Sequence, residues 1–196
     1  MAVHKSQRAA AQQYQNAVNN AQGHFFEDYI KRACVLYSQQ GRAEIEKTPE
    51  PFRVTAKNRK DGTFSGLFTA HAQPDFQGTL DGGRSIVFEA KYTTTDRLKK
   101  EAVTEEQAKR LQYHHERGAL AAVCAGIQNN FFFVPWPIWD DMKNLYGRKY
   151  VTADDLKTFR VKFNGSVLFL DYVAQIGGRW IKGADCSPDR WRNGHV

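Results

Sequence analysis

The sequence predicts an α/β protein in which a central mixed β-sheet is flanked by helices. Apolar residues at three- and four-residue spacing over residues 23–41 predict an amphipathic helix. Residues 120–126 form an unbroken run of apolar and small residues, which is typical of a strand buried in the middle of a sheet. Predicted strands are also interleaved with helices along the chain, and this order favours the α/β class.

The first half of the chain begins with this helix, which Gly41 is placed to end. Farther along, apolar and polar residues alternate on both sides of an Asp61-Gly62 turn, which predicts a β-hairpin over residues 53–72. The other strands expected in this half are residues 43–52, 71–76 and 85–91, the last two joined by the turn Asp81-Gly82-Gly83.

The second half contains a clear helix start at Thr104, because Gln107 stands at the third helical position and completes a capping box. Gly118 is placed to end this helix. Thr152 is a good N-cap for a later helix. Residues 92–100 read as a polar connector. The remaining predicted elements are strands at residues 131–134 and 167–173 and helices at residues 138–145 and 150–159.

The chain length suits one domain with short appendages. Residues 1–22 are rich in Gln, Asn and Ala and are expected to form a flexible N-terminal arm. Residues 23–176 form the predicted domain, from which the hairpin at 53–72 projects because it contains few apolar residues. Residues 177–196 are expected to be a basic C-terminal tail.

Composition narrows the partners and the compartment. The net charge of +7 favours a polyanionic partner, nucleic acid before acidic membrane. The three cysteines are widely spaced and odd in number, which predicts reduced thiols and neither a disulfide framework nor a zinc site. The sequence has no run of about 18 apolar residues and no apolar signal region, so we expect a cytoplasmic protein without a membrane span.

The candidate catalytic residues lie within residues 74–91. Asp75 comes before a Gly-rich turn, and a short apolar run then leads into Glu89 and Lys91. Residues i and i+2 of a strand point to the same face, so Glu89 and Lys91 would stand side by side. A hairpin at the turn would bring Asp75 back beside Glu89.

Two carboxylates and an ammonium in this arrangement suit a hard divalent metal held against a phosphate. Asp75 and Glu89 would be metal ligands, and the backbone carbonyl of Ala90 could supply another oxygen. Lys91 would hold the phosphate or a water molecule. The alternative is that Glu89 and Lys91 form a surface ion pair, which would contribute little energy.

Other residues also allow two interpretations. Glu27 could belong to the active site, or it could be a solvated acid that the N-terminal helix dipole favours. Gln107 could reach the active site or merely close its capping box. The cluster at the hairpin tip could probe DNA or form a solvated loop; it consists of Lys57, Arg59 and Lys60.

Several of these stretches together resemble the RecU family of Holliday junction resolvases. They are PDFQG at residues 74–78, VFEAK at residues 87–91 with threonines after it, the helix that carries Gln107, AAVCAGI at residues 121–127 and FFFVP at residues 131–135. The resemblance spans about residues 23–159. It includes EKTPEPF with the basic hairpin, which is similar to the family's stalk, and GHFFE at residues 23–27, which is similar to its first-helix motif.

The resemblance implies the type II restriction-endonuclease-like fold, a nuclease domain at residues 23–176, and an endonuclease that resolves four-way DNA by paired nicks. It implies Mg²⁺, with Mn²⁺ as a substitute, no organic cofactor, and a homodimer acting on branched DNA. By position, Asp75 and Glu89 would be metal ligands, Lys91 the group that positions phosphate or water, and Glu27 and Gln107 supporting groups. Lys57, Arg59 and Lys60 would contact DNA near the strand crossover.

Two other functions fit the same residues. One is a nuclease of the same fold that acts on flaps, nicks or duplex DNA. The other is a non-catalytic DNA-binding relative, against which the intact set of Asp75, Glu89 and Lys91 argues.

Overall fold

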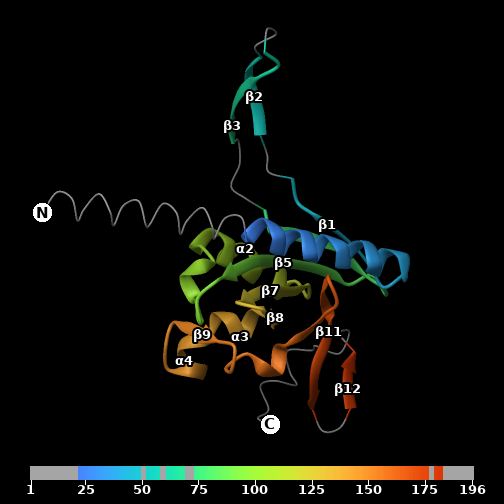
Figure 1. The fold of residues 1–196 in the computed structure, drawn as a ribbon, viewed down its shortest axis with the longest axis vertical. Helices are drawn as coiled ribbons and strands as arrows, with labels where there is room; N and C mark the ends of the chain where they lie inside the picture. Colours follow the sequence, from blue (N-terminus) through green and yellow to red (C-terminus); the bar gives the residue numbers. More distant parts are fainter. Residues whose placement is uncertain (1–21, 50–51, 58–60, 69–72, 177–178, 183–196) are drawn as a thin grey trace, which may run out of the picture.

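A computed structural model describes residues 22–49, 52–57, 61–68, 73–176 and 179–182. Its centre is a five-stranded sheet in the order β1-β4-β5-β7-β8 (Figure 1). Only β5 and β7 run parallel, and the other neighbours in this sheet are antiparallel. The predicted central mixed sheet is therefore confirmed. Its strands are β1 (Ala43–Lys47), β4 (Phe76–Leu80), β5 (Ser85–Thr93), β7 (Leu120–Ile127) and β8 (Asn130–Pro135).

The first helix, residues 22–39, covers one face of the sheet (Figure 1). Phe88 of β5 lies opposite Phe76 of β4, and their rings stack at a centroid distance of 5.0 Å. Tyr92 is on the same side of β5, because alternate residues of a strand share a face. Its ring lies 5.7 Å from that of Phe26 in the first helix. Aromatic contacts therefore fix this helix against the sheet.

The opposite face of β5 carries Glu89 and meets α2 (Glu105–Glu116). The predicted capping box is present, since the Thr104 side chain and the Gln107 side chain each bond to the other residue's backbone N–H. Gly118 follows the helix with a φ of +84°, a conformation that glycine adopts easily. The predicted limits of this helix are confirmed.

Every residue of β7 is buried, as expected for a strand between β5 and β8 with both faces covered. Small residues make this possible. At Gly126, an added Cβ would lie only 2.4 Å from Cδ2 of Tyr92, so glycine leaves the space that the tyrosine ring occupies.

A second sheet, in the order β10-β11-β12, packs beside the first. Asp171 of β11 anchors it, because its carboxylate accepts a hydrogen bond from the Tyr37 hydroxyl and two from Arg42. Arg42 follows the first helix, so this contact joins the two ends of the described domain. The strands are β10 (Val161–Phe163), β11 (Val167–Ile176) and β12 (Arg179–Lys182), and β12 lies in the stretch predicted as tail.

The helix predicted over residues 150–159 is wrong. That stretch contains β9 (Tyr150–Thr152), a turn, and the short 3-10 helix η2 (Lys157–Phe159). Thr152 does act as a cap, because its hydroxyl accepts the N–H of Asp155 at 3.4 Å. However, β9 pairs with β6 (Arg97–Lys99), a strand within the stretch predicted as a connector. Pairing between distant segments overrides the local helix signal.

Other boundaries also differ from the prediction. Two predicted strands lie partly outside the described residues: residues 71–72 of the strand expected at 71–76, and residues 50–51 of the one expected at 43–52. Among the described residues, β4 begins at Phe76 and β1 ends at Lys47. The helix expected at residues 138–145 is divided at Asp141. Its two parts are α3 (Trp136–Asp140) and α4 (Met142–Tyr146). Elsewhere, the short 3-10 helix η1 (Lys100–Ala102) precedes α2.

The predicted hairpin is present as a separate two-stranded sheet of β2 (Phe52–Lys57) and β3 (Phe64–Phe68). It stands away from the body of the protein (Figure 1). Lys57 is exposed, whereas Arg59 and Lys60 lie outside the described residues. So do the predicted N-terminal arm up to residue 21 and the end of the tail from residue 183. Across the described ranges, no helix has the length and apolar character needed to cross a membrane.

Candidate active site

Asp75 is fixed at the point where β4 meets β5. The last backbone pair of these strands is Phe76 with Phe88. Beyond this pair, the side chain of Asp75 bonds to the backbone of β5. Its Oδ2 accepts the N–H of Ala90 at 2.9 Å. Its backbone carbonyl accepts the N–H of Thr48 at 2.9 Å. Both neighbouring strands therefore hold Asp75 in place, beside Glu89 as predicted.

Glu89 is fully buried, with 0% of its surface exposed. Its Oε2 accepts hydrogen bonds from Lys91 Nζ at 3.2 Å and from Gln107 Nε2 at 2.5 Å. Its Oε1 is buried and has no hydrogen-bond partner among the described residues. A buried carboxylate oxygen without a partner is costly, so this atom is suited to meet a cation or a proton.

The charges of this site act on Glu89. Burial raises the pKa of Glu89 to about 8, and the negative charge of Asp75 adds to the rise, while Lys91 opposes it. The ammonium of Lys91 lies 3.2 Å from Glu89 Oε2 and 3.7 Å from Asp75 Oδ2. The side chains of Asp75 and Glu89 thus share one ammonium in a largely dry site.

The side chain of Gln107 both closes the capping box of α2 and reaches Glu89. Its Oε1 accepts the backbone N–H of Thr104 at 3.0 Å and closes the capping box. Its Nε2 donates to Glu89. The helix start and the buried carboxylate are therefore joined by a single side chain.

Glu27 lies in the first helix and forms an ion pair with Lys47 of β1. Lys47 is opposite Phe76 in register, so its side chain shares the face of Phe76, away from Asp75. Within the described residues, Glu27 forms no hydrogen bond or ion pair with Asp75, Glu89 or Lys91. Its role in catalysis stays a prediction.

Sequence reasoning gave Lys47 no role. The alternation of β1 indicates that Lys47 faces the covering helix, because Ala43 and Ile45 are buried and Lys47 occupies the next position on the same face. A lysine placed on the covered face of a strand predicts an acidic partner from the covering helix.

Close approach of β1 to β4 is what brings Thr48 to Asp75. Gly78 of β4 makes it possible, because an added Cβ would lie 2.0 Å from the carbonyl oxygen of Glu44 and 2.6 Å from Cα of Ile45. Both atoms belong to the backbone of β1 and have little freedom to move.

The donor set limits which metal could bind. Among the described residues, no three His, Cys, Asp or Glu side chains gather as a metal cluster. Asp75 and Glu89 supply two carboxylates. Mg²⁺ is commonly bound by one or two carboxylates, with water and substrate phosphate completing its shell. The unpaired Oε1 of Glu89 and the adjacent Asp75 therefore fit Mg²⁺ or Mn²⁺ and do not fit a metal that needs four protein ligands.

The pKa of Glu89 leads to a stability prediction. Between about pH 4.5 and 8 the folded protein keeps a proton that the unfolded chain releases, so the free energy of unfolding falls as pH rises through this window. Glu89→Gln removes the titration. In EDTA, we expect the free energy of unfolding of this variant, relative to that of the wild type, to rise by about 2–4 kcal/mol as the pH goes from about 5 to about 9. Urea unfolding at each pH measures it.

The matched control for this prediction is Glu46→Gln, which changes an exposed glutamate of β1. The gain of Glu89→Gln in this pH range should exceed that of the control. A gain no larger than that of Glu46→Gln would show that Glu89 is charged throughout this pH range in the folded protein.

A solved structure of Hjc, a Holliday junction resolvase from the archaeal hyperthermophile Archaeoglobus fulgidus, is similar at 13% identity and a TM-score of 0.40, over 69% of this chain and 87% of that one. A comparison with curated proteins gave no match. The family model described as RecU, Recombination protein U, matches residues 21–177. Because this match covers most of the chain, the protein belongs to the RecU family.

Proposed function

We propose that the protein is a Mg²⁺-dependent endonuclease that resolves four-way DNA junctions by paired symmetric nicks during recombination and repair. The observation that carries the proposal is the fully buried Glu89: its Oε2 lies 3.2 Å from the ammonium of Lys91, which also contacts Asp75, and its Oε1 has no hydrogen-bond partner among the described residues. A protein that only binds DNA would gain nothing from such a residue, because a buried carboxyl group with one oxygen unpaired destabilises the fold.

Asp75, Glu89 and the backbone carbonyl of Ala90 would hold the ion. When bound, Mg²⁺ neutralises charge at the scissile phosphate and acidifies water for the attack. The chain's own groups act around it. The N–H of Ala90 keeps the Asp75 carboxylate turned toward β5. Gln107 keeps Glu89 in one orientation by its bond to Oε2, while Oε1 stays without a hydrogen-bond partner among the described residues.

Lys91 is the group we assign to the substrate. Its ammonium is mostly covered, with 18% of the side chain exposed, and it is already desolvated for an electrostatic contact. Its donors can orient the attacking water or neutralise a non-bridging phosphate oxygen as charge develops. Glu27 would support the site at a distance, by holding Lys47 and with it the end of β1 that positions Asp75.

Two symmetric nicks require two such sites, so we propose a homodimer with twofold symmetry. The hairpin of β2 and β3 would direct the dimer to branched DNA, with Lys57, Arg59 and Lys60 close to phosphates at the crossover. Recognition would then depend on DNA shape more than on sequence, and binding would weaken steeply with salt.

The test is a cleavage assay on a four-way junction, a flap and a linear duplex of the same sequence, each with Mg²⁺ and with EDTA. We expect paired nicks in the junction only when Mg²⁺ is present. Equal rates on linear duplex would replace the resolvase by a nuclease for other DNA. No cleavage of any substrate in Mg²⁺ or Mn²⁺ would leave a non-catalytic DNA-binding protein.

A further inference from the structure

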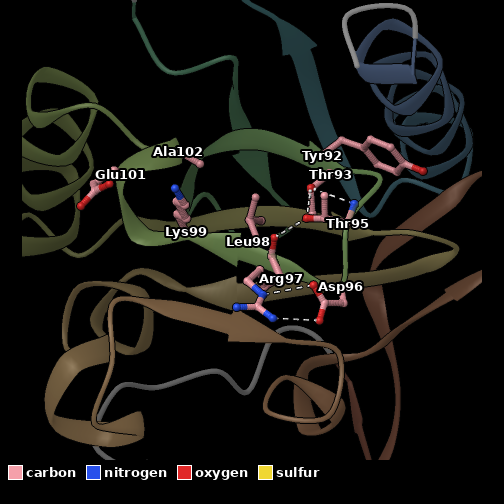
Figure 2. A pocket seen from close by; sticks show the side chains of 9 residues that line it. All are labelled: Tyr92, Thr93, Thr95, Asp96, Arg97, Leu98, Lys99, Glu101 and Ala102. Carbon is pink, nitrogen blue, oxygen red and sulfur yellow. Dashed lines mark hydrogen bonds and ion pairs between the residues drawn. The ribbon is translucent and has the colours of Figure 1, made fainter. Parts of the chain in front are cut away.

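An open pocket of about 580 Å³ lies at the end of β5, the strand that carries Glu89 and Lys91. Its lining begins at Tyr92, the residue after Lys91, and continues past Thr95 to Arg97 and Lys99 (Figure 2). Glu89, Lys91 and Thr93 share one face of β5, because alternate strand residues point the same way. A line of polar side chains therefore leads out of the active site into this pocket.

The turn after β5 is held in one shape. The hydroxyls of Thr93 and Thr95 lie 2.8 Å apart, and the hydroxyl of Thr95 donates to the carbonyl of Arg97 at 3.0 Å. Figure 2 shows these groups facing one another at one end of the pocket, with Arg97 and Lys99 farther along. The turn thus sets where the cations of β6 stand relative to β5.

The ribbon formed by β6 (Arg97–Lys99) and β9 (Tyr150–Thr152), here called the β6–β9 ribbon, has one apolar and one polar face. Leu98 and Val151 lie opposite each other and are buried. Arg97 is opposite Thr152, and Lys99 is opposite Tyr150, so these four side chains share the outer face. The outer face therefore presents two cations beside a tyrosine ring.

Tyr150 orders this face. The guanidinium groups of Arg97 and Arg148 lie over its ring, at 5.1 Å and 4.9 Å from the centroid. Arg148 is further tied to Asp155 at 2.5 Å, and that carboxylate also accepts the N–H and the hydroxyl of Thr152. Arg148 is thus held by contacts within the protein, and its position fixes the ring of Tyr150, over which Arg97 lies.

Arg97 and Lys99, by contrast, are available to a ligand. Arg97 pairs with its chain neighbour Asp96, and both side chains are mostly exposed, at 52% and 66%. Exposed pairs of this kind are weak, and a phosphate offers guanidinium a stronger bidentate partner. The ammonium of Lys99 forms no ion pair or hydrogen bond with the described residues, and it is exposed.

We propose that the β6–β9 ribbon binds the DNA backbone next to the cut, with Arg97 and Lys99 on phosphates that flank the scissile one and Tyr150 positioning Arg97. This inference rests on the proposed endonuclease function. The chain's net charge of +7, and the place of Thr93 in the pocket wall only two residues after Lys91 on the same face of β5, favour a polyanionic strand as the occupant. The ribbon would hold a junction arm while the hairpin engages the crossover.

The test uses Arg97→Gln with Lys99→Gln in the full chain, and it measures the affinity for a four-way junction in EDTA between 50 and 300 mM salt, about the range over which such contacts are resolved. We expect the slope of log affinity against log salt to become shallower by about 2, because each lost phosphate contact removes about 0.9. At about 150 mM salt the affinity should fall at least about 10-fold. Arg97→Lys should keep the slope.

The matched control is Lys31→Gln with Arg32→Gln, which removes the same charge from the first helix. Arg32 also lies over a tyrosine ring, that of Tyr29, at 5.6 Å. The control should change the slope by less than half as much. An equal change in both double variants, or no change in the first, would overturn the inference. Thermal unfolding confirms that each variant is folded, and Lys99→Gln alone replaces the double variant if Arg97→Gln unfolds.

A neutral methylphosphonate at single positions around the cut locates the contact. In the wild type, neutralising the contacted phosphate should weaken binding about as much as the loss of one cation. In the double variant the same substitution should have no further effect, as expected when both changes remove one interaction. If the wild type cleaves the junction but the two effects add, the ribbon proposal fails while the endonuclease proposal stands.

Discussion

Asp75→Asn is expected to lower the rate of junction cleavage at least about 10³-fold and to change the affinity for the junction by less than about threefold. Asparagine keeps the shape of the side chain and the oxygen that accepts the N–H of Ala90. It loses the negative charge that would bind Mg²⁺. The cleavage rate is measured under single-turnover conditions with Mg²⁺, and the affinity is measured in EDTA.

The matched control for Asp75→Asn is Asp81→Asn, which makes the same change in an exposed turn at the far end of β4 and β5. This variant should cleave at the wild-type rate. Full cleavage by Asp75→Asn would rule out the proposed site. Combined loss of cleavage and binding, together with a lower melting temperature, would point to misfolding instead of lost chemistry.

Gly78→Ala is expected to reduce the free energy of unfolding by about 3 kcal/mol or more. The new Cβ would meet the backbone of β1 at 2.0 and 2.6 Å, and backbone cannot move aside as a flexible side chain can. β1 would have to separate from β4, which would also release Thr48 from Asp75. Urea unfolding followed by circular dichroism measures the change.

Gly23→Ala is the control for this effect of an added methyl group. Gly23 lies in the first helix with nothing within 4 Å of an added Cβ. Alanine there should leave the stability unchanged or raise it slightly, because alanine favours helix more than glycine. If Gly78→Ala were as stable as Gly23→Ala, the close approach of β1 to β4 would not hold in solution.

The core of the candidate site could be predicted from sequence because its geometry is local. Glu89 and Lys91 are two residues apart on one strand, and a short turn returns the chain to Asp75. Period-two alternation and turn chemistry are sufficient to place such groups together. The depth of burial of Glu89 could not be predicted in this way, because it depends on α2 and β7, which come later in the chain.

The failures have a common physical cause. The capping signal at Thr152 was real, but it opened only a turn, because β9 gains its backbone hydrogen bonds from β6 some fifty residues earlier. The pair of Glu27 and Lys47 likewise depends on where the first helix lies across β1. Local propensity does not encode such long-range pairings, and tertiary contacts override it.

The double attachment of Gln107 has an evolutionary consequence. Glutamate and glutamine close a capping box equally well, and glutamate would also suit the dipole at a helix N-terminus. At this position, however, glutamate would set a third carboxylate against Glu89. Fewer substitutions are therefore tolerated at position 107 than helix capping alone would permit, and their effect depends on the residue at position 89. Drift at one of the two positions would be epistatic with the other, although eighteen residues separate them in the chain.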